Sequence, residues 1–285
     1  MANATMKSEL KNTWEMAAPG WAKWEHIFAQ GFSQATDVLL DMAAIDPGMH
    51  VLDIACGAGS QSIEAARRVG SEGHVIASDI SNTMLEHVRQ NALKAGVKNI
   101  ETLAAAADEL DANLGPFDAS ICRMGLMLFP APQKALSALR PLLRPGARFA
   151  ALVFSSPGHN PFLSQPMAIL LRHAGKSPPE PGSPGIFALG GDGVLERLLA
   201  ESGFEDIKTR TVHADVVLPS AKDALHLMQE AAGAYRAVVA HLDDDAKSRA
   251  WDEVNECLKQ FETENHFETR LEAIIGSGAN PGQSS

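Results

Sequence analysis

The segment Val51–Ser60 contains the residues with the clearest capacity for chemistry. It reads VLDIACGAGS, an apolar run that includes Asp53 and is followed by the turn Gly57-Ala58-Gly59. Glycines in such a turn allow the backbone to approach a ligand with no Cβ in the way. A glycine turn between an apolar strand and a helix is typical of a nucleotide site. We therefore predict that this segment binds a nucleotide-type cofactor.

The residues on either side of the turn predict the elements that position it. Val51–Ile54 is largely β-branched and aliphatic, which suits a buried parallel strand. Ser60–Val69 begins with a hydroxyl residue, contains good helix formers and precedes Gly70, which is placed to end a helix. The sequence therefore predicts a strand, a glycine turn and a helix in succession.

Two classes of cofactor bind at such a turn. The dinucleotide fingerprint G-x-G-x-x-G requires a third small position, and Ser62 stands there. Asp53 would repel a diphosphate, whereas it would favour a cationic group or a hydroxyl donor. S-adenosylmethionine carries a sulfonium and an ammonium group, so it suits the segment better than NAD, which remains the alternative cofactor.

Asp53–Gly59 resembles the D-x-A-C-G-x-G motif of the class I S-adenosylmethionine-dependent methyltransferases. The resemblance is to the branch that includes ubiquinone and menaquinone C-methyltransferases and many natural-product O-methyltransferases. Further landmarks follow in the order of that family, and the specific part of the resemblance ends at Phe154. These landmarks are the apolar strands in Gly73–Ser81, Asn99–Leu103, Pro116–Arg123 and Leu143–Phe154.

The resemblance implies a cofactor role for several residues. Asp79 would hold both ribose hydroxyls, since a carboxylate accepts two adjacent hydrogen bonds. Ile80 and Met84 would lie against adenine, Ala107 would donate its backbone N–H to the ring, and Asp108 would accept from the exocyclic amine. The complete expected set is Trp21, Asp53, Ala55, Gly57, Gly59, Asp79, Ile80, Met84, Ala107, Asp108 and Arg123.

Some of these residues also have a purely structural interpretation. Asp108 would equally serve to cap a short helix beginning at Glu109, and Ile80 and Met84 are types found in ordinary cores.

Trp21, Trp24 and Phe28 lie on one face of a predicted helix that begins at Pro19-Gly20 and ends at Gly31. Aromatic residues of this kind are ordinarily core. In the resembled family, however, an N-terminal helix closes over the cofactor, and a ring near the sulfonium would gain about 1 kcal/mol from cation–π attraction.

The alternation of strands and helices predicts an α/β fold. The resemblance implies a Rossmann-like, mostly parallel seven-stranded sheet with helices on both faces and a small helical lid. We expect a single domain over residues 1–275. Its parts are a cofactor-binding core at 33–154, a Pro-, Gly- and Ser-rich lid or acceptor insertion at about 155–184, and C-terminal helices and strands at 185–275; residues 276–285 are expected to be disordered.

Within the later part of the chain, hydrophobic patterns predict individual elements. Helices are expected at 166–174, 222–240 and 246–261, and a last, antiparallel strand at 267–275. Asp243-Asp244-Asp245 precedes the third of these helices, where acidic residues cap the helix and favour its dipole. We therefore expect these aspartates to stabilise a helix rather than to bind a metal.

The composition limits the class of partner. The 285-residue chain has a formal net charge of −11 and a pI near 5.3, which disfavours a surface that follows nucleic-acid phosphates. Three widely spaced cysteines form neither a metal motif nor a disulfide framework. No signal peptide or membrane span is predicted. We therefore expect a cytoplasmic enzyme with a small-molecule acceptor and no membrane insertion; the oligomeric state is not indicated.

The expected reaction needs little chemical assistance from the protein. Transfer of a methyl group from a sulfonium is an in-line displacement with a neutral leaving group, so positioning dominates. No metal is expected, because the Asp and Asn-Asp spacing of the metal-dependent catechol methyltransferases is missing after the fourth strand. No catalytic base is assigned; His26, His159, His173, His226 and His241 are each expected to be structural or solvated.

Together these observations predict a methyltransferase that acts on a small aromatic or apolar molecule, with oxygen narrowly preferred over carbon as the accepting atom. C-methylation of a quinol precursor is the alternative within the same family. An NAD-dependent oxidoreductase and a protein that binds S-adenosylmethionine without transferring its methyl group are the hypotheses from other classes.

Overall fold

The computed structural model describes residues 2–180 and 183–282, and side chains from residue 10 onward. A seven-stranded sheet with the order β3-β2-β1-β4-β5-β7-β6 lies at its centre. The pairs among β1 to β5 are parallel, and β7 runs antiparallel to β5 and β6. The strands are β1 (His50–Ile54), β2 (His74–Asp79), β3 (Ile100–Ala104), β4 (Phe117–Arg123), β5 (Leu143–Phe154), β6 (Glu205–Leu218) and β7 (Phe267–Ala279).

This sheet confirms the predicted α/β, mostly parallel, seven-stranded fold. The strand order reverses between β1 and β4, which pair with each other in the middle of the sheet. Ligands of doubly wound sheets bind in the crevice beyond the carboxyl ends of the strands at such a reversal. We therefore expect a binding site near Ile54 and Arg123, the last residues of β1 and β4.

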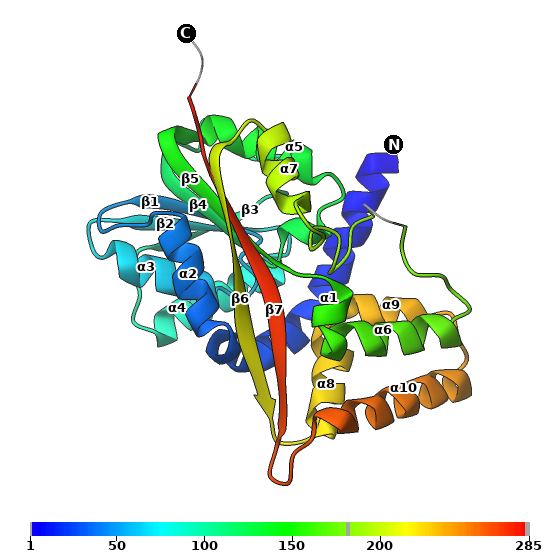
Figure 1. Ribbon diagram of the computed structural model, residues 1–285. Coiled ribbons are helices and arrows are strands. Elements are labelled where there is room, and N and C mark those ends of the chain that lie inside the picture. Colours follow the sequence, from blue (N-terminus) through cyan, green and yellow to red (C-terminus); the bar gives the residue numbers. More distant parts are fainter. Residues whose placement is uncertain (1, 181–182, 283–285) are drawn as a thin grey trace.

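Helices cover both faces of the sheet (Figure 1). Two consecutive residues of β7 show this: a Cβ at Gly276 would lie 2.6 Å from Leu195, whereas the Ser277 hydroxyl donates to the Met42 carbonyl at 2.7 Å. Adjacent strand residues face opposite sides, so the helices that contain Leu195 and Met42 cover opposite faces. The helices around the sheet are α2 (Ser33–Met42), α3 (Ser60–Val69), α4 (Asn82–Lys94), α5 (Pro132–Leu139) and α7 (Val194–Glu201).

The local signals around α3 and α4 act as the sequence predicts. Gly70 follows the last residue of α3 with a positive φ of 68°. Ser81 caps α4, and its hydroxyl accepts the Met84 N–H at 3.1 Å. These elements depend on nearby residues, which is why their bounds could be predicted closely.

The N-terminal helix α1 (Ala2–Gly31) is longer than predicted. The expected start at Pro19 is wrong, because the helix continues through this proline, although its end at Gly31 is confirmed. Contacts with other elements hold this part of the helix in place, since the Glu15 side chain accepts the Asn82 N–H of α4 at 2.8 Å. A Cβ at Gly20 would lie 2.1 Å from the Glu230 carbonyl oxygen, so α1 packs backbone against backbone there.

A helical cap forms a second group of helices beside the sheet (Figure 1). It consists of α6 (Pro161–His173), α8 (Ala221–Ala231), α9 (Gly233–Val239) and α10 (Asp244–Leu258). Only α6 comes from the insertion predicted at 155–184, so that assignment of the lid is incomplete; residues 181 and 182 of the insertion lie outside the described residues. The predicted helix 222–240 is also wrong as one element, since it divides at Ala232 into α8 and α9.

Asn160 joins the beginning of the cap to the sheet through hydrogen bonds. The ladder between β5 and β7 ends at Phe154 and Ala273. Beyond it, the fully buried Asn160 accepts the Glu272 N–H through Oδ1 at 3.0 Å and donates from Nδ2 to the Glu272 carbonyl at 3.0 Å. One side chain thus continues the hydrogen bonding of a strand.

Two predictions about the C-terminal half can be assessed from individual residues. Asp243 accepts the Ala246 N–H at 2.7 Å, which confirms it as the cap of α10. The disordered tail predicted from residue 276 is wrong for Gly276–Ala279, which belong to β7 and pair with Arg148–Ala151. Gly276 and Gly278 fit there because their missing side chains admit α7 and Phe204. Residues 283–285 lie outside the described residues.

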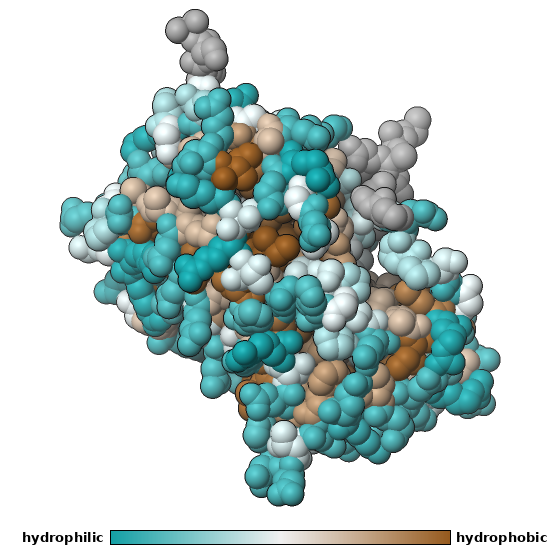
Figure 2. Space-filling model, viewed as in Figure 1, coloured by the Kyte–Doolittle hydropathy of each residue, from teal (hydrophilic) through white to brown (hydrophobic). Residues whose placement is uncertain are grey.

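The face of the molecule in Figure 2 is mainly hydrophilic. On the face in Figure 2, hydrophobic residues form separate patches among hydrophilic ones, as expected for a chain with a net charge of −11. Over the ranges 2–180 and 183–282, no helix is sufficiently long and apolar to cross a membrane. Within the same ranges, no group of three or more His, Cys, Asp or Glu side chains is arranged to hold a metal ion.

Candidate functional site

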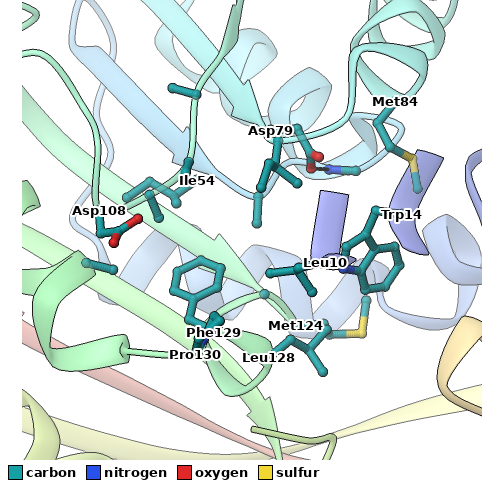
Figure 3. Close-up of a pocket in the computed structure, with 18 of the residues that line it drawn as sticks. Leu10, Trp14, Ile54, Asp79, Met84, Asp108, Met124, Leu128, Phe129 and Pro130 are labelled. Carbon is teal, nitrogen blue, oxygen red and sulfur yellow. Dashed lines mark hydrogen bonds between the residues drawn. The ribbon is translucent and has the colours of Figure 1, made fainter. Parts of the chain in front are cut away.

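A cavity lies at the strand reversal, between the carboxyl ends of β1, β2 and β4 and the helix α1. It encloses about 960 Å³, its open mouth included. Figure 3 shows Asp108 and Trp14 at opposite sides of this space, with Asp79 on another wall. The predicted cofactor residues that line it are Trp21, Ala55, Gly57, Asp79, Ile80, Met84, Ala107, Asp108 and Arg123.

Asp79 is held in place by two backbone hydrogen bonds. It ends β2, is only 8% exposed, and accepts the Gly57 N–H at 3.0 Å and the Ser81 N–H at 2.9 Å, one on each carboxylate oxygen. Each oxygen retains a further acceptor position. Asp79 therefore fixes the glycine turn and the start of α4 while offering two parallel acceptors, which suits a vicinal diol.

The environment of Asp79 predicts a pH dependence for ligand binding. Burial raises its pKa to about 6, although the hydrogen bonds from Ser81 and Gly57 oppose the shift. The ionised form is the better double acceptor, so affinity for a ribose ligand is expected to increase as the pH rises from 5 to 7. Calorimetric titration with S-adenosylhomocysteine checks this, and a constant affinity across that range would contradict it.

The effect on folding has the opposite sign. A carboxyl group whose pKa is higher in the folded than in the unfolded chain stabilises the fold below its unfolded pKa of about 4. For Asp79 this contribution is lost as the pH rises through about 6. Denaturant unfolding without ligand should therefore show this component of stability decreasing between about pH 4 and about pH 6.

Asp53 does not line the cavity, so the predicted direct contact with the cofactor is wrong. Its fully buried carboxylate lies under the turn, where it accepts from the Ser62 hydroxyl at 2.5 Å and from Gln61 Nε2 at 3.4 Å. Burial raises its pKa to about 7, and the hydrogen bond from Ser62 is the largest opposing effect. Asp53 therefore attaches β1 to the beginning of α3.

Gly59 is also absent from the cavity wall, and its predicted role is corrected in the same way. It adopts a φ of +93°, and a Cβ built on it would lie 3.0 Å from both Cγ atoms of Val88. The residue is thus a glycine because α3 and α4 approach closely. Gly57, in contrast, lines the cavity with a φ of +56° and faces Trp21.

Gly59→Ala is accordingly expected to lower stability rather than to remove a ligand contact. The left-handed backbone and the Val88 contact together should cost about 2 to 4 kcal/mol. Urea unfolding measures this free energy. Affinity for S-adenosylhomocysteine in the fraction that remains folded should change less than threefold; a large loss of affinity without a loss of stability would contradict this assignment.

The first helix contributes a wall that the sequence analysis only partly identified. Leu10 and Trp14 line the cavity together with Trp21. The Trp14 and Trp21 rings meet edge to face with centroids 6.1 Å apart, and Trp21 stacks on Phe28 at 4.4 Å. The spacing 14, 21, 28 is a signal for one helical face, but it was missed because the helix was expected to begin at Pro19.

Trp24, from the same predicted aromatic face, does not line the cavity. Its Nε1 donates to Glu230 Oε2 at 2.7 Å, and Lys23 pairs with the same carboxylate. Trp24 therefore joins α1 to the cap.

The segment after β4 forms an apolar wall, which sequence reasoning also missed. It contains Met124, Leu128, Phe129, Pro130 and Ala131. Met124 and Ala55 both line the cavity with positive φ angles of 63° and 54°, which are unusual for residues with a Cβ. Strained residues of this kind are concentrated at functional sites.

The comparisons with known proteins agree with this geometry. A family described as "Methyltransferase domain" matches residues 45–168. The ubiquinone/menaquinone biosynthesis C-methyltransferase UbiE of Idiomarina loihiensis is 36% identical to this chain over 119 residues, which make up 41% of this chain and 47% of that protein. Over this region the chain is similar to the class I S-adenosylmethionine-dependent methyltransferases.

Solved structures extend the likeness of the fold beyond the matched region. The YcgJ protein of Bacillus subtilis has a TM-score of 0.58 at 17% identity, over 88% of this chain and 100% of that one. The [4+2]-cyclase SpnF has a TM-score of 0.53 at 18% identity, over 87% and 82% of the two chains. These two comparisons concern the fold alone. By sequence, the chain spans about half the length of the curated relatives it matches.

The glycine turn is poorly suited to NAD, the cofactor of the competing oxidoreductase hypothesis. In dinucleotide sites the diphosphate lies at the N-terminus of the helix after the glycine turn. Here that position faces Glu25, whose Oε1 accepts the Ser60 N–H at 3.1 Å. A buried carboxylate at this point would repel a diphosphate, so the residues present favour the sulfonium cofactor.

Proposed function

We propose that the chain transfers a methyl group from S-adenosylmethionine to a small aromatic or apolar molecule. The observation that carries the proposal is the division of the cavity into a polar and an apolar part. Asp79, Asp108 and Arg123 are the ionisable residues among the described lining residues, whereas α1 and the segment after β4 supply aromatic and aliphatic side chains. A charged donor and an apolar acceptor would suit these two parts.

For the donor, each predicted residue receives a role consistent with its place in the wall. Asp79 would accept the ribose hydroxyls. Ile80 and Asp108 would face adenine, as would the backbone of Ala107. The methionine end would then extend toward Gly57 and Arg123, at the carboxyl ends of β1 and β4.

For the acceptor, Trp14, Leu128 and Phe129 provide a surface without hydrogen-bonding capacity apart from the Trp14 ring N–H. The cofactor would supply the methyl group: a lone pair or carbon π pair of the acceptor would form the new bond, and the electrons of the C–S bond would remain on the thioether sulfur. A methylated ring carbon would then lose its proton to solvent. The chain would orient the reactants and exclude water, contributions that can amount to roughly 7 to 11 kcal/mol.

Oxygen remains our preferred accepting atom, and carbon is the competing choice. No histidine, lysine or tyrosine occurs among the described lining residues, so a phenol would have to arrive ionised or lose its proton to solvent. The naming of the UbiE relatives as C-methyltransferases supports the second candidate, methylation of a quinol carbon. SpnF, named a cyclase, keeps open the hypothesis of a protein with this fold that transfers no methyl group.

A labelling experiment tests the proposed function and identifies the accepting atom. The purified protein is incubated with S-adenosylmethionine carrying a ¹³C-labelled methyl group and separate phenols, quinols and enols. Carbon NMR of the product distinguishes an O-methyl from a C-methyl group. Mass spectrometry of small molecules released from the protein should detect S-adenosylmethionine or S-adenosylhomocysteine, and recovery of NAD instead would overturn the proposal.

A further inference from the structure

Glu25 is a buried carboxylate of which only one oxygen accepts a hydrogen bond. It lies on α1, one helical turn beyond the cavity residue Trp21, and is only 8% exposed. Its Oε1 accepts the Ser60 N–H, whereas the buried Oε2 has no hydrogen-bond partner. Burial of a carboxylate is costly unless its oxygens are bonded or a positive charge lies near. Glu25 is therefore either a simple cap of α3 or part of a charged binding site.

Arg123 is the nearest indication of such a site. This guanidinium lines the cavity, is 5% exposed and has neutral hydroxyl partners: Nη1 donates to Thr36 at 2.9 Å and Nη2 to Ser60 at 2.5 Å. Its buried Nε has no partner. Burial lowers the pKa of Arg123, and the charge of Glu25 is the largest influence that raises it. The two side chains therefore interact electrostatically without forming a direct ion pair.

Ser60 connects these two charged groups. Its backbone N–H binds Glu25 and its hydroxyl binds Arg123. Ser60 follows the glycine turn, so the opposite charges are held at the Gly57 end of the cavity, away from the residues assigned to adenine. A ligand with both an ammonium and a carboxylate would complement this arrangement, because each charge would meet its opposite in a water-poor environment.

We propose that Arg123 and Glu25 recognise the amino-acid end of S-adenosylmethionine. Arg123 binds the carboxylate directly, and Glu25 is a positioning residue whose charge favours the ammonium and whose hydrogen bond holds Ser60 against Arg123. The inference rests on the proposed function, which it deepens by assigning a specificity role to Glu25. Sequence spacing gave no indication of this role, since Glu25 and Ser60 are 35 positions apart.

Three ligands distinguish a role of Glu25 in recognising the ammonium group from a merely structural role. S-adenosylhomocysteine has both charges, its deaminated analogue retains the carboxylate, and 5′-methylthioadenosine lacks the amino-acid end. Calorimetry measures their affinities for the wild type, for Glu25→Gln, and for Glu64→Gln. Glutamine at position 25 keeps an acceptor for the Ser60 N–H and removes the charge. Glu64, paired with Arg67 on the half-exposed side of α3, is the matched charge control.

Glu25→Gln is expected to weaken S-adenosylhomocysteine binding roughly ten- to hundredfold, the range of a charged hydrogen bond. Methylthioadenosine affinity should change less than twofold, and the deaminated analogue should bind equally well or more tightly because Arg123 has lost its neighbouring negative charge. Glu64→Gln should bind all three ligands as the wild type does.

The results that would contradict the role of Glu25 differ from those that would contradict the proposed function. An equal loss for all three ligands would show that Glu25 only maintains the structure, and no loss for any ligand would remove it from recognition; either result overturns the inference. A measurement on the wild type alone provides a second test: deaminated S-adenosylhomocysteine should bind at least tenfold more weakly than the parent, and equal binding overturns the role of Glu25. Failure of the wild type to bind both S-adenosylhomocysteine and methylthioadenosine would instead contradict the proposed function.

Discussion

Asparagine in place of Asp79 is expected to weaken S-adenosylhomocysteine binding roughly 30- to 100-fold. Each carboxylate oxygen already accepts one backbone N–H, from Gly57 or Ser81, and charged hydrogen bonds contribute about 1.5 to 3 kcal/mol each. In the variant, the amide NH₂ must replace one oxygen and then faces a backbone donor. The substitution therefore removes a ribose acceptor and disturbs the turn. Calorimetry at pH 8, where the wild-type carboxyl is ionised, measures the loss.

Asp118→Asn is the matched control for this variant. Asp118 also accepts a backbone N–H, from His50 at 2.8 Å, but it lies near the amino end of β4, away from the cavity. This control should bind S-adenosylhomocysteine within twofold of the wild type. If Asp79→Asn retained wild-type affinity, the assignment of the ribose site would be wrong.

Gly20→Ala is expected to detach α1 from the cap. Alanine normally stabilises a helix interior by about 1 kcal/mol relative to glycine. Here its Cβ would lie 2.1 Å from the Glu230 carbonyl oxygen, and a backbone atom cannot move aside as a side chain can. Overpacking typically costs about 1 to 3 kcal/mol or more, so the clash should outweigh the gain in helix propensity.

The predicted consequence of Gly20→Ala is a loss of both stability and binding. Thermal unfolding should occur at a lower temperature, and S-adenosylhomocysteine affinity should fall at least fivefold as Trp14 and Trp21 leave the cavity wall. Gly158→Ala provides the comparison, because its nearest neighbour would be the Ser156 hydroxyl at 3.9 Å. Unchanged binding in a destabilised Gly20→Ala variant would show that the α1 wall is dispensable for the cofactor.

The cofactor half could largely be predicted from the sequence because short-range signals specify it. Gly70 ends α3, Ser81 begins α4, and Asp79 follows an apolar strand at the distance of one strand-helix-strand unit. Each signal acts on residues a few positions away. The strand order of the sheet then brings these ends together, as the resemblance implied.

The direction in which each side chain points was harder to predict from the sequence. Asp53 and Gly59 belong to the same motif as Gly57, yet one binds Ser62 and the other makes room for Val88. Proximity to a ligand loop in sequence does not determine which side of the loop a residue faces. Both assignments therefore failed for the same reason, although the motif itself correctly indicated the cofactor class.

Contacts between distant segments were the least predictable feature. Trp24 binds Glu230 across 206 positions, and α6 packs with α10 although β6 lies between them in the chain. Hydrophobic periodicity indicates that a helix has a buried face, but it does not name the partner. The composition of the cap and the wall contributed by Trp14 could therefore emerge only from the structure.

The chain passes from the sheet into the cap at two separate points, and this has an evolutionary consequence. One follows β5 and is fastened by Asn160, and the other lies between β6 and β7. The family match ends at residue 168, so α8, α9 and α10 fall beyond it. None of the described residues of these helices lines the cavity, which they reach through α1, where Glu230 of α8 accepts the Trp24 N–H. The cap can therefore diverge among related proteins without a change in the strands and loops that line the cavity.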